Sequence, residues 1–225
     1  MKGDVREEWD AHWARLAGPA STFGRIATLV REQILSRAVL SYAERYLPRQ
    51  GVLVEMGCGS AESSRRIPRA VRNLVALDFS AGALRQARAA GVFGSFVQGD
   101  LERLPFGAAT VDGAWNLGVL EHFEEEKGIR ILAELRRVLK PGGVAVLFWP
   151  PEFGSSRLVL APIEALRSRT SGRPFLFFPD EVNRLRSKAH ARQILAAAGL
   201  EPVAVDFSPR AAFIHVVVVA RRPGP

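Results

Sequence analysis

The chain has 225 residues, of which 48% are hydrophobic and 24% charged, as in an average soluble globular protein. This composition excludes a disordered chain and a collagen-like repeat, and the single cysteine, Cys58, excludes a disulfide scaffold or a multi-cysteine zinc site. No apolar run approaches the roughly 20 residues of a membrane span. Because the charged N-terminus also lacks the apolar core of a signal peptide, we expect a cytoplasmic protein without a membrane span.

The net charge is +8 and the sequence pI is about 10.6. Residues 151–225 contribute most of the excess, with 11 basic and 6 acidic residues. A basic chain suits nucleic acid, a membrane surface or an acidic substrate. A simpler explanation is an Arg- and Ala-rich composition whose arginines solvate helix faces.

The first predicted element is a helix over residues 22–47, where apolar residues recur at helical spacing. Ser21 or Thr22 would cap this helix, and Pro48 would end it. Ahead of it, Trp9 and Trp13 are four residues apart and would share one helical face. We therefore expect residues 1–47 to form an N-terminal helical cap.

From residue 51 onward the pattern alternates between short apolar runs and helical periodicity. Strands are predicted at 52–56, 74–77, 94–98, 111–117 and 144–149, with helices at 61–70, 80–90 and 124–139. This rhythm predicts βαβ units, a parallel sheet and helices on both of its faces. The proline-rich stretch 151–180 interrupts it. A helix at 180–198 follows, and then strands at 203–207 and 213–220, which a short turn would pair antiparallel.

The strongest local signal is a glycine-rich turn after the first strand, in the segment VLVEMGCGSAE at 52–62. Gly57 and Gly59 have no Cβ atoms, so backbone N–H groups can approach a ligand there. A dinucleotide fingerprint would require glycine at position 62, where the chain has Glu62. The loop therefore favours a nucleotide-like ligand without phosphates. Cys58 has no visible partner base, so we interpret it as a small residue that fits the loop rather than a nucleophile.

Acidic residues follow the next two strands. Asp78 lies about 20 residues beyond the glycine turn, where a carboxylate accepts hydrogen bonds from ribose hydroxyls; alternatively it caps a helix together with Ser80. Asp100 could accept the exocyclic amine of a base, or could belong to a plain turn. The segment DGAWNLGVLEH at 112–122 is a strand that opens into a loop. In a parallel sheet all these groups would meet beyond the carboxyl ends of the strands.

Together these segments, with VALDFS, GDLERLPF and LAELRRVLKPGGVAVLF, resemble class I S-adenosylmethionine-dependent methyltransferases, in particular the type 11 small-molecule group. The resemblance is close over about residues 45–150. It implies an α/β, Rossmann-like, doubly wound seven-stranded sheet, mostly parallel with an antiparallel last strand. We expect a single domain over 1–225, with a cofactor-binding core at 48–150, a lid or substrate insertion at 151–180, and a final helix and hairpin at 181–225.

The resemblance also implies S-adenosylmethionine as cofactor, S-adenosylhomocysteine as product, and a role for each matching residue. The methionine part would contact Glu55, Gly57, Cys58 and Gly59. Asp78 would hold the ribose, Phe79 would flank the adenine, and Asp100 with the Leu101 backbone would meet the adenine amine. The backbone around Asn116 and Leu117 would face the sulfonium and the amino group.

Methyl transfer from a sulfonium needs a general base only if the acceptor must lose a proton. His122 is the candidate base because its ordinary pKa is near neutral; otherwise it is a structural residue. Glu121 is a weaker candidate, and the run Glu124–Glu126 is expected to be a solvated helical turn. We expect His190 and His215 at the surface. No Cys/His cluster predicts a metal site.

The acceptor is predicted to be a small molecule held under a lid formed by the N-terminal aromatics and residues 151–180. Because residues 151–192 hold 8 basic and 4 acidic residues, an anionic acceptor is a further hypothesis. An RNA or protein methyltransferase is an alternative, although the lack of an added RNA-binding domain makes nucleic acid a poor fit. A nicotinamide-dependent oxidoreductase is opposed by Glu62 and the closing hairpin. A non-catalytic cofactor-binding module, the oligomeric state and the acceptor atom stay open.

Overall fold

A computed structural model describes Trp9, residues 31–68, residues 72–152, Arg169, residues 181–209 and residues 213–224. Its centre is a seven-stranded sheet with the order β3-β2-β1-β4-β5-β7-β6. The strands are β1 (Gly51–Met56), β2 (Arg72–Asp78), β3 (Ser95–Gln98), β4 (Val111–Leu117), β5 (Leu139–Trp149), β6 (Glu201–Asp206) and β7 (Val216–Arg221). The neighbours from β3 to β5 pair parallel, whereas β7 is antiparallel to both β5 and β6. The predicted class and the antiparallel last strand are confirmed.

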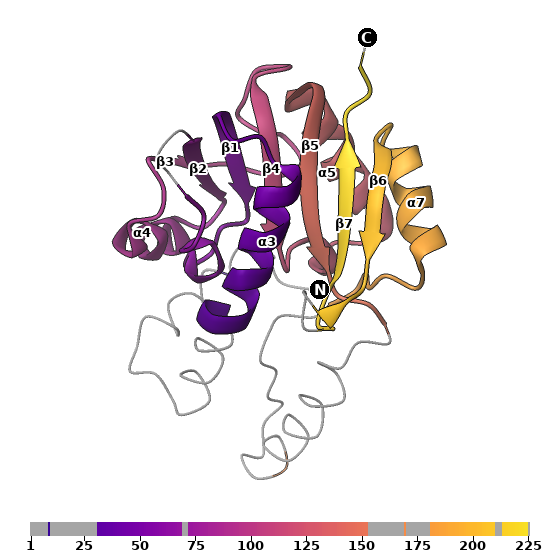
Figure 1. Ribbon diagram of the computed structural model, residues 1–225, viewed down its shortest axis with the longest axis horizontal. Coiled ribbons are helices and arrows are strands. Elements are labelled where there is room, and N and C mark those ends of the chain that lie inside the picture. The colour runs from indigo at the N-terminus through magenta and orange to yellow at the C-terminus, as the bar shows by residue number, and fades with distance from the viewer. Residues whose placement is uncertain are drawn as a thin grey trace, which may run out of the picture.

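Helices cover both faces of the sheet (Figure 1). The longer helices are α3 (Ser36–Tyr46), α4 (Ala81–Ala90), α5 (Glu125–Val138) and α7 (Lys188–Ala197), and the short ones are η1 (Arg31–Leu35), η2 (Glu62–Ser64) and η3 (Leu120–His122). α3 lies in front of the sheet in Figure 1, and α5 and α7 lie behind it. Within the described residues, no helix has the length and apolar character needed to cross a membrane.

Two hydrophobic cores, one on each side of the sheet, explain why the strands are apolar along almost their whole length. One core holds α3 and α4 against the sheet, with Tyr42 and Leu84 among its buried side chains. The other holds α5 and α7, and the α5 residues Ile131 and Leu135 are 0% and 1% exposed there. The apolar residues whose spacing predicted a helix at 124–139 are thus the residues that α5 buries against the sheet.

The predicted helix at 61–70 is wrong. Over its described part, residues 61–68, the chain forms only the short 3-10 helix η2, which begins after Ala61, a non-glycine residue at φ +63°. Ser63 and Ser64 are both buried, and the indole Nε1 of Trp115 donates to Ser64 Oγ at 3.1 Å. A tertiary contact with β4 therefore replaces the helix expected from local sequence.

Other predicted boundaries also change. Within the described part of the predicted helix 22–47, a π-helical turn (η1) precedes α3; residues 22–30 lie outside the described part. α7 starts at Lys188, eight residues later than predicted, with Ser187 accepting from His190 N–H. Just before it, Leu185 forms a parallel bridge with Pro151, two residues beyond the end of β5. β5 itself begins at Leu139 rather than residue 144, so it also includes the glycine turn after α5.

Candidate functional site

The loops that follow β1 to β4 meet at the carboxyl edge of the sheet, as the sequence predicted. The strand register brings them level, because Met56 pairs with Leu77, Asp78 with Gln98, and Glu55 with Trp115. In an open parallel sheet this edge is where ligands bind. We call the loops after β1, β2 and β3, where the sequence predicts the cofactor contacts, the cofactor half of the edge. Residues 118–122 with 181–185, beside which we expect the acceptor, are called the acceptor half.

The glycine turn after β1 is fixed by its backbone. Gly57 and Cys58 both donate N–H groups to the Leu77 carbonyl, at 2.8 and 3.0 Å. Gly57 has φ +69° and a Cβ there would lie 2.7 Å from Val119 Cγ2, so the turn requires glycine. The turn consequently packs closely against the loop after β4, and its conformation is set by the sheet rather than by a helix N-terminus.

Asp78 is 5% exposed, and its carboxylate faces the glycine turn. Its Oδ2 accepts the Gly59 N–H at 3.0 Å and its Oδ1 accepts the Ser80 N–H at 2.9 Å. These two bonds orient the carboxylate toward the glycine turn, where the sequence predicts the ribose hydroxyls. Ser80, not Asp78, caps α4, because its side chain accepts the Ala83 N–H.

Two polar side chains near this edge are buried without a complete set of partners. Glu55 is 1% exposed, and within the described residues its Oε2 has no hydrogen-bond partner. Burial raises the pKa of Glu55 to about 8, although Ser64 and Trp115 hydrogen bonds act against that rise. Asn116 in β4 is 0% exposed, and neither amide atom has a partner in the same described part. Unpartnered buried groups cost about 1–3 kcal/mol each, and they suit a ligand that brings an amino group.

The loop after β3 continues the cofactor half. Gly99 donates its N–H to the Asp78 carbonyl at 3.1 Å, and Gln98 Nε2 donates to the Phe79 carbonyl at 2.9 Å. Asp100 Oδ1 accepts the Glu102 N–H at 2.9 Å. Leu101 is 7% exposed and belongs to the core beneath α5. The structure therefore brings the predicted ribose and adenine residues onto adjacent loops.

Cys58 is buried within the glycine turn. Burial raises the pKa of its thiol well above the ordinary range, and the charges of Asp78 and Glu55 raise it further. A thiol that stays protonated is a poor nucleophile, in keeping with the interpretation of Cys58 as a residue that fits the loop.

The acceptor half carries buried ionisable groups. The His122 side chain is 7% exposed, and its Nε2 lies 3.9 Å from Glu121 Oε1. Its ring meets the Trp9 ring edge-on at 4.9 Å, so residue 9 reaches the loop after β4. His12, Trp13 and Phe23 lie outside the described residues. Leu117 is half-buried at the end of β4, before Gly118 at φ +71° turns the chain into η3.

Glu121, the weaker candidate base, is buried, which the sequence did not predict. Its side chain is 4% exposed and burial raises its pKa to about 8. Its carbonyl accepts the N–H groups of Val182 and Asn183 at 2.7 and 3.0 Å. Beside it, a polar cavity of about 390 Å³ is lined by Glu152, Glu181, Val182 and Arg184. The return of residues 181–185 to this edge, which no local pattern predicts, buries Glu121.

The predicted surface positions of His190 and His215 are wrong, since both side chains are buried. His190 Nε2 lies 2.8 Å from Glu125 Oε2, which also pairs with Arg186 at 2.9 Å. Glu125 is thus a partner of α7 as well as part of the first turn of α5. His215 lies edge-on to Phe148, and burial lowers its pKa to about 4. Across the described ranges, no group of three His, Cys, Asp or Glu side chains could hold a metal ion.

Comparison with known proteins defines the class. Residues 54–147 match the type 11 methyltransferase domain. Demethylmenaquinone methyltransferase of Renibacterium salmoninarum is 30% identical over 166 residues, covering 70% of this chain and 69% of that protein. A malonyl-[acyl-carrier protein] O-methyltransferase of Pseudescherichia vulneris is 32% identical over 164 residues, covering 70% and 62%. Across the first curated relatives, the matched share of their own length runs from 36% to 69%.

The fold agrees with solved structures. Magnesium protoporphyrin IX methyltransferase of Synechocystis, with bound S-adenosylhomocysteine, superposes with a TM-score of 0.68 at 21% identity, over 97% of this chain and 98% of that one. The seven-stranded sheet with its antiparallel β7 is therefore a class I methyltransferase fold. The chain belongs to the S-adenosylmethionine-dependent methyltransferases and carries the type 11 domain.

Proposed function

We propose that this chain transfers the methyl group of S-adenosylmethionine to a small-molecule acceptor, and that the acceptor or its carrier is anionic. The observation that carries the cofactor part is the orientation of the Asp78 carboxylate by two backbone N–H groups beside the glycine turn. The buried Oε2 of Glu55, which has no partner among the described residues, suits the amino group of the methionine part. The fit of S-adenosylmethionine to this site therefore rests on the hydrogen-bonding groups of Asp78 and Glu55.

When bound, S-adenosylmethionine would supply a methyl group activated by its sulfonium, with the neutral thioether S-adenosylhomocysteine as the leaving group. The chain's own contribution is positioning and exclusion of water. Gly57 and Gly59 allow backbone approach, Asp78 would hold the ribose hydroxyls, and Asp100 would accept the adenine amine. The backbone around Asn116 and Leu117 would lie beside the reacting centre.

His122 is proposed as the group that accepts a proton from acceptors that must lose one. Its Nε2 faces Glu121, and Trp9 packs against its ring. His122→Ala should lower kcat for such an acceptor by at least tenfold, while the Kd for S-adenosylhomocysteine changes less than twofold. Equal turnover in this variant over pH 6–8 would assign His122 a structural role.

The acceptor is proposed as anionic because the chain carries a net charge of +8 with its excess in the last third. A related enzyme named for malonyl-[acyl-carrier protein] gives a precedent for an anionic acyl group on a carrier. The arginines of the proposed lid, Arg157, Arg167, Arg169 and Arg173, lie outside the described residues apart from Arg169, which is exposed. Replacing all four with Gln should raise the acceptor KM and leave the cofactor Kd unchanged. An unchanged KM would contradict the proposal that the acceptor is anionic.

The first experiment is calorimetric titration of S-adenosylmethionine and of NADPH into the wild type. Saturable binding of S-adenosylmethionine alone supports the proposal, whereas binding of NADPH alone would contradict it. Labelled-methyl screening then compares small anionic metabolites, acyl-carrier conjugates and RNA. Salt-dependent methylation of RNA would favour the RNA methyltransferase, and cofactor binding without any turnover would favour a non-catalytic module.

A further inference from the structure

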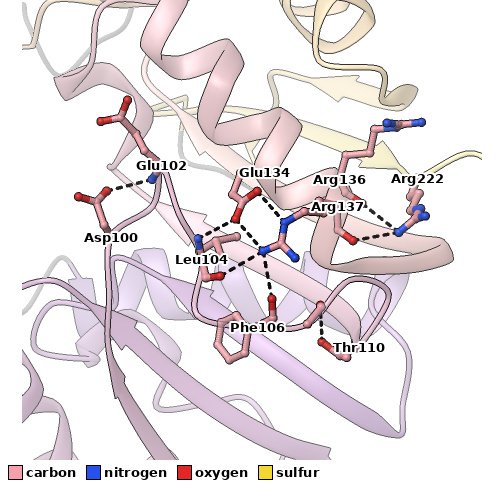
Figure 2. Close-up of polar contacts among 10 residues, drawn as sticks. Asp100, Glu102, Leu104, Phe106, Thr110, Glu134, Arg136, Arg137 and Arg222 are labelled. Carbon is pink, nitrogen blue, oxygen red and sulfur yellow. Dashed lines mark hydrogen bonds and ion pairs between the residues drawn. The ribbon is translucent and has the colours of Figure 1, made fainter.

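The loop that carries Asp100 is attached to α5 along its length. Residues 99–106, which we call the base loop, leave β3 and run beside α5 toward β4 (Figure 2). Four charged residues of α5 face it, and their spacing of three, four and three residues places them on one helical face. They are Lys127, Arg130, Glu134 and Arg137.

The first half of this face contacts a side chain of the base loop. Glu102 pairs with Lys127 Nζ at 2.6 Å and with Arg130 Nη2 at 3.4 Å. These pairs are exposed, and exposed pairs contribute at most about 1 kcal/mol. These two ion pairs therefore stabilise the position of the base loop only weakly.

The second half contacts the loop backbone. Glu134 Oε1 accepts the Leu104 N–H at 2.9 Å, and Arg137 Nη2 donates to the Leu104 and Phe106 carbonyls at 3.1 and 3.0 Å. The two side chains also bind each other, with Arg137 Nε 2.8 Å from Glu134 Oε2. The Arg137 hydrogen bond holds the pKa of Glu134 below its ordinary value. Both side chains are therefore charged at neutral pH, and their charged hydrogen bonds hold backbone groups of the base loop.

The held segment is coupled to Asp100 by close packing. A Cβ on Gly99 would lie 2.8 Å from Pro105 Cγ, so the two ends of the base loop touch. Arg103 donates its N–H to the Asp100 carbonyl at 3.2 Å. Leu101 and Leu104 are 7% and 3% exposed, which anchors the same loop in the core. A shift of residues 104–106 must therefore move Asp100.

We propose that Glu134 and Arg137 are positioning residues that set the base loop and, through Asp100, determine how strongly the protein discriminates the base of its cofactor. This inference rests on the proposed function, because it takes Asp100 as the group that meets the adenine amine. Neither residue touches the reacting atoms, so the chemical step with bound cofactor is unaffected.

The test compares calorimetric Kd values for S-adenosylhomocysteine and S-inosylhomocysteine, in which an oxo group replaces the adenine amine. The wild type should prefer the amine. Arg137→Met should lower this preference by about tenfold, as expected for the loss of charged hydrogen bonds, with kcat at saturating S-adenosylmethionine within twofold. Glu134→Gln keeps an acceptor for Leu104 N–H and should retain most of the preference.

Arg222→Met is the matched control. Arg222 Nη1 donates to the Arg136, Arg137 and Leu139 carbonyls at the end of α5, and this variant leaves the base loop contacts intact (Figure 2). It should lower the melting temperature and leave the preference unchanged. If Arg137→Met does not fold, the exposed double variant Lys127→Met/Arg130→Met should lower the preference by about twofold.

A wild-type preference that survives Arg137→Met, or that survives the exposed double variant where Arg137→Met does not fold, would overturn the inference. A wild type that binds both ligands equally would also overturn it and leave the proposed function standing. A wild type that binds neither ligand would remove the proposed function itself, so the two failures are distinguishable.

Discussion

The two halves of the carboxyl edge are built on different physical principles. In the cofactor half, backbone N–H groups bind backbone carbonyls or the Asp78 carboxylate. The sheet fixes the turn after β1, and α5 side chains hold the loop after β3. In the acceptor half, Glu121 and His122 are buried side by side, and within the described residues Glu121 Oε2 has no partner. The fixed backbone of the cofactor half suits a cofactor that a whole family shares. The ionisable side chains of the acceptor half suit chemistry that differs from one acceptor to another.

The largest expected effect is on the cofactor half. Asp78→Ala should weaken S-adenosylhomocysteine binding by at least about 100-fold, because two hydrogen bonds to a carboxylate are lost at about 1.5–3 kcal/mol each. Calorimetry measures the change. Ser80→Ala is the control, since it removes the α4 cap at about 1 kcal/mol of stability and should leave Kd within a few-fold. Equal losses in both variants would mean that Asp78 acts only through the fold.

The second prediction concerns Glu55, whose pKa burial raises to about 8. A ligand ammonium favours the ionised form, so binding releases a proton and the affinity should rise by up to about tenfold per pH unit from pH 6 to 8. Glu55→Gln should remove this dependence. 5′-Methylthioadenosine lacks the amino-acid part and should bind with an affinity independent of pH. A pH dependence shared by both ligands would contradict the assignment.

The third prediction probes the acceptor half through stability. Burial raises the pKa of Glu121 to about 8, so unfolding at higher pH releases its proton, and the free energy of unfolding falls as pH rises from about 4.5 to 8. Glu121→Gln should flatten this decline by about 1 kcal/mol per pH unit. Urea titrations between pH 6.5 and 8 exclude His215, whose pKa is lowered to about 4, and the difference from the wild type removes the similar contribution of Glu55. The exposed Glu152→Gln is the control, and an equal slope in both variants would contradict the prediction.

The smallest effect is expected at the contact between Trp9 and His122. An edge-on aromatic pair contributes about 0.5–1.5 kcal/mol, so Trp9→Ala should raise the acceptor KM severalfold and change the S-adenosylhomocysteine Kd less than twofold. Trp9→Phe should restore most of the loss. If cofactor affinity falls as much as acceptor affinity, Trp9 contributes to cofactor binding, and its assignment to the acceptor half is wrong.

The sequence predicted the cofactor half better than the acceptor half, for a physical reason. Local sequence patterns specify strands and glycine turns, so β4 at Val111–Leu117 and the turn at Gly57 could be predicted. The predicted helix at 61–70 failed because Ser64 binds Trp115 across the fold. His215 and Glu121 become buried only when distant segments pack over them, and no local spacing signals such burial.

Among the described residues, the buried tryptophans Trp115 and Trp149 give each half of the edge its own optical reporter. Trp115 lies 6.3 Å from Phe93 and binds Ser64 beside Glu55, whereas Trp149 donates its indole N–H to the Asn183 carbonyl at 2.7 Å. With Trp9 and Trp13 replaced by Phe, a single further Trp→Phe change would leave one emitter. Stopped-flow measurements on the two single-tryptophan variants would then follow cofactor and acceptor occupancy separately and show the order in which the two ligands bind.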